Sequence, residues 1–173
     1  MDVEKAILKR RSVRSYKEKK IPQEKLEEII NFGKMAPSAN NRQDWKFILI
    51  TDEKKKEEIY KDAKKQSFIK EASAIIAGIT TNPEDKMTCG IPAGIVDLSI
   101  ALDHISLKAA EEGLGTCWIG AFHQEKAKNT LEIPENHKIV ALMTIGYPKH
   151  SLSEKEKQRK NLKEIISYNT FSE

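Results

Sequence analysis

Apolar residues from Ile95 to Ala110 recur at steps of three and four along the chain, and this spacing predicts a helix. They extend around most of its circumference, and only Asp97, Asp103, His104 and Lys108 interrupt them. A helix that is apolar nearly all round is usually buried on several sides. We therefore expect this segment to be the central helix of the molecule, buried on several sides.

Shorter apolar runs predict four strands, at residues 46–51, 72–80, 116–119 and 138–145. Four further helices are predicted at residues 3–9, from Ile21 onward, at 52–64 with Asp52 as N-cap, and at 123–131. The second of these helices should bury Leu26, Ile29, Ile30 and Met35. The pattern indicates a single α+β domain over residues 1–173, with a mixed sheet of about four to five strands around the buried central helix.

The composition fits a globular protein with a strongly charged surface. Of the 173 residues, 39% are hydrophobic and 32% are charged, which is enough for one domain with a core. No apolar run approaches the ~18 residues of a membrane span, and the N-terminus lacks the apolar core of a signal peptide, so a cytoplasmic protein is expected. The two cysteines, Cys89 and Cys117, suggest neither a zinc site nor a disulfide framework.

Arginine is scarce, and its placement is informative. The net charge is +4, but most lysines alternate with glutamates, as on solvated helix faces. Three of the five arginines lie within Arg10, Arg11, Ser12, Val13 and Arg14. Guanidinium groups suit phosphate oxygens, so this pentapeptide indicates either a phosphate site or a surface basic patch, and the residues alone do not decide between them.

A polar loop at residues 36–45 is unusually rich in amide and hydroxyl groups. Asparagine and glutamine amides can bind the edge of a heterocycle, although the same residues also favour an ordinary capped loop. The four histidines have no metal-ligand spacing, and Ser12 and Ser38 have no nearby candidate base. Dinucleotide, P-loop and serine-hydrolase motifs are absent. We infer that a bound cofactor supplies the chemistry.

Five motifs, taken together, resemble the nitroreductase family of FMN-dependent oxidoreductases. They are RRSVR at residues 10–14, APSANNRQDW at 36–45, GLGTCWIG at 113–120, IGYP at 145–148, and KQR at 157–159 followed by the segment 162–166. Their order and spacing agree with the family over nearly the whole chain. The resemblance implies a homodimer with FMN at the interface, the central helix in that interface, and a tail at about 152–173 that packs on the partner chain.

The resemblance also implies a reaction and a set of contacts. NADH or NADPH would pass hydride to FMN, and a small flat acceptor such as a nitroaromatic or quinone would then take the electrons, with no dedicated catalytic residue and with Arg14 stabilising the reduced flavin. The implied cofactor contacts comprise a phosphate and pyrimidine set, a ring-lining set from the partner chain with two weaker glutamine candidates, and the backbone of the GLGTCWIG motif. In that order they are Arg10, Arg11, Ser12, Arg14, Lys157 and Arg159; Pro37, Ser38, Ala39 and Asn41 with Gln43 and Gln66; and Cys117, Trp118, Ile119 and Gly120.

Two departures from the family pattern bear on function. Asp44 stands where the family usually has proline, and little sequence separates the strand at 72–80 from the central helix, where larger members carry a substrate cover. Other flavin chemistry on the same scaffold, such as dehalogenation, flavin fragmentation or dehydrogenation, therefore stays open. A basic nucleic-acid-binding module is a further alternative, but acids are interleaved with the lysines and no aromatic platform lies among them. Neither a metal site nor a membrane partner is expected.

Overall fold

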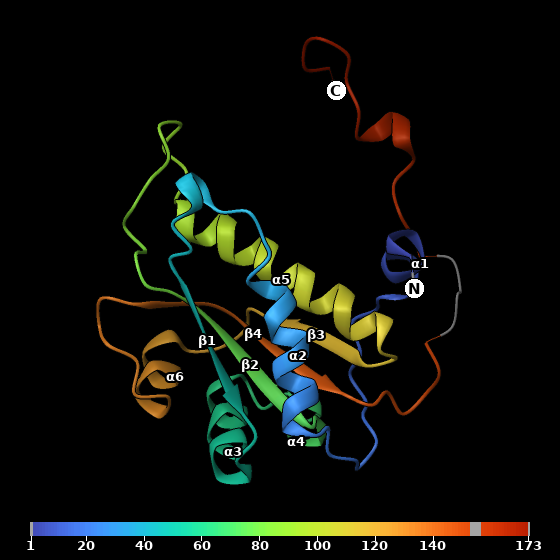
Figure 1. The fold of residues 1–173 in the computed structure, drawn as a ribbon, viewed down its shortest axis with the longest axis vertical. Helices are drawn as coiled ribbons and strands as arrows, with labels where there is room; N and C mark the ends of the chain where they lie inside the picture. The colour runs from blue at the N-terminus through green and yellow to red at the C-terminus, as the bar shows by residue number, and fades with distance from the viewer. Residues whose placement is uncertain (1, 153–156, 173) are drawn as a thin grey trace.

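The computed structural model describes residues 2–152 and 157–172 (Figure 1). Its helices are α1 (Val3–Lys9), α2 (Gln23–Gly33), α3 (Glu53–Asp62), α4 (Phe68–Glu71), α5 (Ala93–Glu111) and α6 (Gln124–Thr130). Two short 3₁₀ helices are η1 (Ala39–Asn41) and η2 (Leu162–Glu164). The strands are β1 (Trp45–Ile50), β2 (Ala74–Thr80), β3 (Gly115–Ile119) and β4 (Lys138–Gly146).

The four strands form one sheet in the order β1-β2-β4-β3, and each neighbouring pair is antiparallel. The sequence predicted a mixed sheet, but within residues 2–152 and 157–172 the parallel pairing is limited to an isolated bridge between Ser12 and Thr116. This bridge places the segment after α1 alongside the outer strand β3. The sheet thus carries the arginine-rich pentapeptide at its β3 edge.

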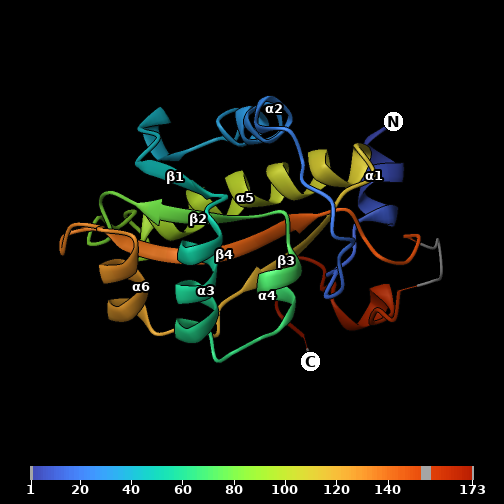
Figure 2. The ribbon, with the colours of Figure 1, turned by 90° about the horizontal axis from the view of Figure 1, so that it is seen from below.

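Helices cover both faces of the sheet, with α2 and α5 on one side and α3, α4 and α6 on the other (Figure 2). Alternate residues of β2 serve the two layers, as the two-residue period of a strand requires. Ile75 and Ala77 belong to the core under α3, whereas Ala74 and Ile76 pack in the core under α5. Every residue of β2 is buried in consequence, which explains its continuously apolar sequence.

The central helix α5 buries much of its surface within its own chain. Leu98, Leu102 and Ile105 are completely buried there, between the sheet and α2. An interface of this helix with a second chain, which the family resemblance implies, would therefore not involve these three positions. Apolar surface that α5 leaves accessible includes Ile95, which is 39% exposed near the start of the helix, and Leu107, which is half-buried in its C-terminal half.

The elements predicted from the sequence are present, with two differences. Met35 is 68% exposed rather than buried, because α2 ends at Gly33 and the chain turns there, with Met35 N bonded to Phe32 O. The four-residue helix α4 was not predicted. The predicted N-cap is confirmed, since the Asp52 carboxylate accepts from Lys55 N at 2.9 Å. Within the described ranges, every helix is too short or too polar to cross a membrane.

Candidate cofactor site

Four of the cations predicted to bind phosphate line one cleft. Arg10 and Arg11, which follow α1, meet Lys157 and Arg159 from the tail in a hollow of about 1060 Å³ against the C-terminal half of α5. Lys157 Nζ donates to Ile7 O at 2.5 Å and so ties the tail to α1. Residues almost 150 positions apart in the sequence therefore form one basic site, whose volume is close to the upper end of the range for small-molecule clefts.

Among the described residues that line this cleft, basic side chains outnumber acidic ones. Burial lowers the pKa of Lys157, and the neighbouring charges of Arg10, Arg11 and Arg159 lower it further. Acidic side chains in the lining include Asp103 of α5, which the sequence does not assign to the site. An anion bound among these groups would relieve their mutual repulsion.

The segment that carries the arginines is held on β3 by backbone and core contacts. Val13 N donates to Thr116 O at 2.9 Å, and the Val13 side chain is buried beside Gly115. A Cβ atom on Gly115 would lie 2.5 Å from Val13 Cγ2, so this close approach requires glycine. Since neighbouring residues of an extended segment point to opposite sides, Ser12 and Arg14 are exposed while Val13 is buried.

Tyr16 reinforces this arrangement from the core. Its hydroxyl is 2.8 Å from both Val13 O, to which it donates, and Thr144 Oγ1. Burial raises the pKa of Tyr16, against the opposite effect of the Thr144 hydrogen bond. The phenol therefore stays protonated at neutral pH and acts as a fixed brace between the segment and β4.

The end of β3 offers accessible backbone near the arginine segment. Gly120 is exposed, with open space where a Cβ atom would be, and Trp118 is 38% exposed. Ile119 and Cys117 point their side chains into the core, so only their backbone is available to a ligand. Burial raises the pKa of the Cys117 thiol, while the charge of Arg14 partly offsets that rise. Cys117 is thus an inert core residue rather than a reactive thiol.

The polar loop lies elsewhere, against the N-terminal half of α5 (Figure 1). Ser38 Oγ accepts from Gln43 N at 3.1 Å, and the Gln43 amide donates to Asn41 O and Oδ1. Ala39 N donates to the buried carboxylate of Asp97 at 3.0 Å. In the sequence, Asp97 stands out only as a polar interruption of an apolar helix, and that interruption was the available signal.

One chain does not bring all the predicted cofactor contacts into one cleft. The lining of the basic cleft contains none of the residues 37–43, and Pro37 is exposed at the start of the separate polar loop. Gln66 lies between α3 and α4, where its amide donates to Ala63 O at 3.1 Å. The structure therefore groups the predicted residues into a basic half with β3 and a polar-loop half on α5, and leaves Gln66 apart from both.

Comparison with known proteins identifies the family of the chain. A family model described as "Putative TM nitroreductase" matches residues 2–173. A "Putative NADH dehydrogenase/NAD(P)H nitroreductase" of Archaeoglobus fulgidus is 31% identical over 149 residues, which cover 84% of each chain. Together with the fold, these matches define the class as α+β oxidoreductases.

Solved structures extend the match over the whole chain. A nitroreductase family protein from Clostridium difficile has a TM-score of 0.87 at 28% identity and covers 99% of this chain and 100% of its own. An NADPH:FMN oxidoreductase from Vibrio harveyi, complexed with NAD+, has a TM-score of 0.88 at 25% identity over 99% of this chain and 78% of its own. The protein belongs to the nitroreductase family.

Proposed function

We propose that the protein is an NAD(P)H-dependent FMN oxidoreductase whose acceptor is a small flat molecule such as a nitroaromatic or a quinone. The observation that carries this proposal is the convergence of Arg10, Arg11, Lys157 and Arg159 in one cleft against α5. The family membership supports it, and so does the name of the Vibrio harveyi structure. An NADPH:FMN oxidoreductase needs both a nucleotide-phosphate site and an open ring site.

The residues of the basic cleft fit the phosphate end of FMN. Two arginines from one segment and a lysine and an arginine from the tail line one space and lie close enough to affect one another's charge. A phosphate dianion accepts several charge-assisted hydrogen bonds, and guanidinium groups donate them in pairs. We assign the phosphate to these four side chains, with Ser12 and Arg14 further along the same exposed edge.

Bound FMN would accept hydride from NAD(P)H and pass it to the acceptor, and the chain's own residues would bind and orient the reactants. Arg14 would place a positive charge beside the pyrimidine edge of the ring, where it favours the anionic reduced form. The exposed backbone at Gly120 would let the ring approach closely. Positioning accounts for most of the catalysis in this scheme.

A second copy of the chain would complete the site. Within one chain, the polar loop lies at the N-terminal half of α5 and the basic half lies at its C-terminal half. Helix α5 also leaves apolar surface accessible, including Ile95. A groove beside the C-terminal half of α5 is lined by Val3, Phe32 and Met35, which are 72%, 43% and 68% exposed. We infer a homodimer in which the loop of one chain faces the flavin held by the basic half of the other.

FMN binding is the direct test. Arg10→Gln and Arg159→Gln should each weaken FMN binding about tenfold, because each removes one charge-assisted contact to phosphate. Lys61→Gln is the matched control, since Lys61 is an exposed cation on α3, on the other face of the sheet. Flavin fluorescence titration at two salt concentrations measures the FMN affinity of each variant and its dependence on charge. Variants that hold FMN normally and lose only turnover would contradict the assignment.

The reductant and acceptor need a separate experiment. Anaerobic stopped-flow mixing of the FMN-loaded protein with NADH or NADPH should bleach the yellow absorbance. A panel of nitroaromatics, quinones and halogenated phenols should then restore it at different rates. Re-oxidation by none of the nitroaromatics or quinones would reject the proposed acceptor class. Colourless protein that refuses FMN would reject the function altogether.

A further inference from the structure

The polar loop holds an unusual concentration of left-handed backbone. Asn40, Asn41 and Gln43 have φ values of 53°, 54° and 56°. Residues other than glycine adopt this region infrequently, and a run of them persists only where the surroundings impose it. Such conformations cluster at ligand-binding sites, so the residues that hold the loop in this conformation are of functional interest.

Asp97 is the first residue that holds the loop. It lies on α5 with only 5% of its surface exposed, and its Oδ2 accepts from Ala39 N at 3.0 Å. Burying a carboxylate inside an otherwise apolar helix face is costly unless it is hydrogen-bonded. The hydrogen bond from Ala39 offsets part of this cost, and it holds the residue that precedes Asn40 and Asn41.

Arg42 is the second such residue, and it joins the polar loop to the loop that precedes α5. Its Nε lies 3.3 Å from Asp44 Oδ2, and its Nη2 is hydrogen-bonded to Asp85. Asp85 in turn accepts from Ala93 N, at the first residue of α5, through its backbone carbonyl at 3.0 Å. The hydrogen bond to Asp85 raises the pKa of Arg42, and the charges of Asp44 and Asp97 act in the same direction. The guanidinium thus sits among three acids that converge on the loop.

We propose that Asp97 and the Arg42–Asp85 pair are positioning residues that hold residues 38–43 in the shape needed to contact the flavin of the partner chain. The inference rests on the proposed function. Each would act through the loop rather than by contact with the cofactor, since Asp97 binds the Ala39 backbone and Arg42 pairs with Asp85. Asp44 stands where the resembling family has proline, and its pairing with Arg42 replaces the rigidity that a proline ring would give.

Three variants test Asp97. Asp97→Ala removes the acceptor, Asp97→Asn keeps an oxygen in its place, and Asp52→Ala removes a comparable carboxylate-to-backbone bond of 2.9 Å on the other face of the sheet. Asp97→Ala should raise the FMN dissociation constant about tenfold and speed hydrogen exchange at residues 39–43. Asp97→Asn should restore most of both properties. Asp52→Ala should lower the unfolding midpoint and leave FMN binding unchanged.

A double-mutant cycle tests the ion pair with exposed residues that do not endanger folding. Arg42→Ala and the double variant should weaken FMN binding by the same factor, because removing Asp85 takes away nothing further once Arg42 is gone, and Asp85→Ala should weaken it by no more than that because the Arg42–Asp44 contact remains. Additive losses would show that each residue acts alone and would overturn the pair as a unit. Retained folding in these variants also covers the case in which Asp97→Ala does not fold.

The outcomes separate this inference from the proposed function. Wild-type protein that binds no FMN rejects the function, and the positioning role with it. Wild-type binding together with unchanged affinity in Asp97→Ala and in the Arg42 variants rejects only the positioning role. Faster exchange in the loop with unchanged affinity would show that the loop is held as described but contributes nothing to the cofactor site.

Discussion

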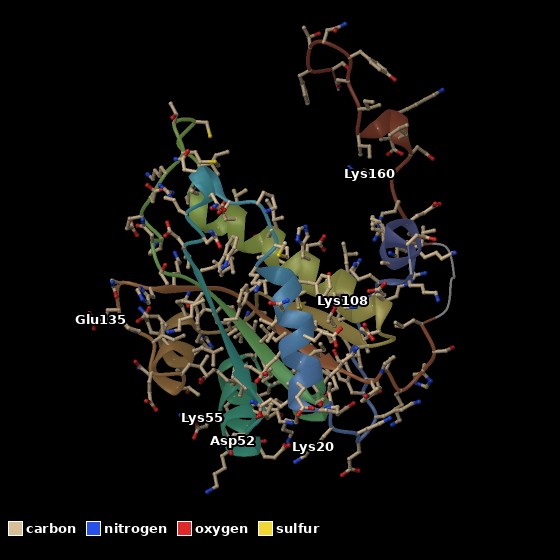
Figure 3. The ribbon with its side chains drawn as sticks, in the orientation of Figure 1. Lys20, Asp52, Lys55, Lys108, Glu135 and Lys160 are labelled. Carbon is tan, nitrogen blue, oxygen red and sulfur yellow. The ribbon has the colours of Figure 1, made fainter. Side chains whose placement is uncertain are left out.

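At the scale of single residues, Lys108 illustrates how this chain uses its many charges. Its Nζ lies between α2 and α5, 2.9 Å from Glu111, 2.6 Å from Glu112 and 4.8 Å from the centroid of the Phe32 ring (Figure 3). Lys25 of α2 reaches the same Glu112 at 2.6 Å. The hydrogen bond to Glu112, with that to Glu111, raises the pKa of Lys108. Since 13% of the Lys108 side chain is exposed, this network is less screened than an ordinary surface pair.

The network predicts a specific acid dependence of stability. Hydrogen bonds from Lys108 and then Lys25 lower the pKa of Glu112 below its ordinary value of 4.5. Its contribution is therefore fully present above that value and is lost as the pH falls through the lower, folded pKa. Glu112→Gln should reduce the free energy of unfolding by about 1 kcal/mol at pH 7, with the difference from wild type shrinking below pH 4.5.

Urea unfolding at several pH values measures this effect. Glu135→Gln is the control, because Glu135 is exposed between α6 and β4 (Figure 3). A wild-type-to-Glu112→Gln difference that stays constant down to pH 3 would show that the charge of Glu112 is not what stabilises the α2–α5 contact.

At the scale of elements, the contact between β3 and residues 11–14 determines where the arginines lie. It depends on the absent side chain of Gly115, which sits against Val13. Gly113, two residues earlier, has a different role, because its φ of 73° ends α5 in the left-handed conformation. The two glycines of one motif thus serve packing and helix termination respectively.

This division predicts different results for two alanine substitutions. Gly115→Ala should destabilise the protein by about 1–3 kcal/mol through overpacking and should weaken FMN binding, because it displaces the arginine segment. Gly113→Ala should cost about 1 kcal/mol through backbone strain, without loss of affinity, since its Cβ would meet nothing within 4 Å. Thermal unfolding and FMN titration check both. Equal affinities for the two variants would contradict the packing role of Gly115.

The elements themselves were largely predictable, because periodicity is a local property. The predicted helix at residues 3–9 matches α1, and the central helix extends only a few residues beyond its predicted range. Helix α4 was missed because four residues show no periodicity. Only the family resemblance predicted that Arg10 and Lys157 share a site, since charge patterns carry no information on long-range contacts. The hydrogen bond between Ala39 and Asp97 could not be predicted from the sequence, because a lone acid in an apolar helix does not reveal its partner.

At the scale of the whole molecule, the tail poses a problem that one chain does not solve. Residues 157–172 run outward past α1, and Lys160 projects with them away from the sheet (Figure 3). Four apolar side chains there, Leu162, Ile165, Tyr168 and Phe171, are 68%, 66%, 78% and 86% exposed. Large apolar side chains gathered on an exposed segment mark an interaction surface. In the proposed homodimer, that surface is covered by the partner chain.

Truncation after Lys160 tests this assembly and the completeness of the site together. The described core packs within residues 2–152, so the shortened chain should fold and keep Arg10, Arg11, Lys157 and Arg159. Its dimer dissociation constant should rise at least about tenfold, because the apolar anchors are gone. FMN affinity should then depend on protein concentration, since the polar loop comes from the second copy. Sedimentation equilibrium with and without FMN measures both quantities, and Lys163→Gln in the full chain controls for tail charge. A truncated chain that dimerises and binds FMN as the full chain does would exclude the tail from the interface.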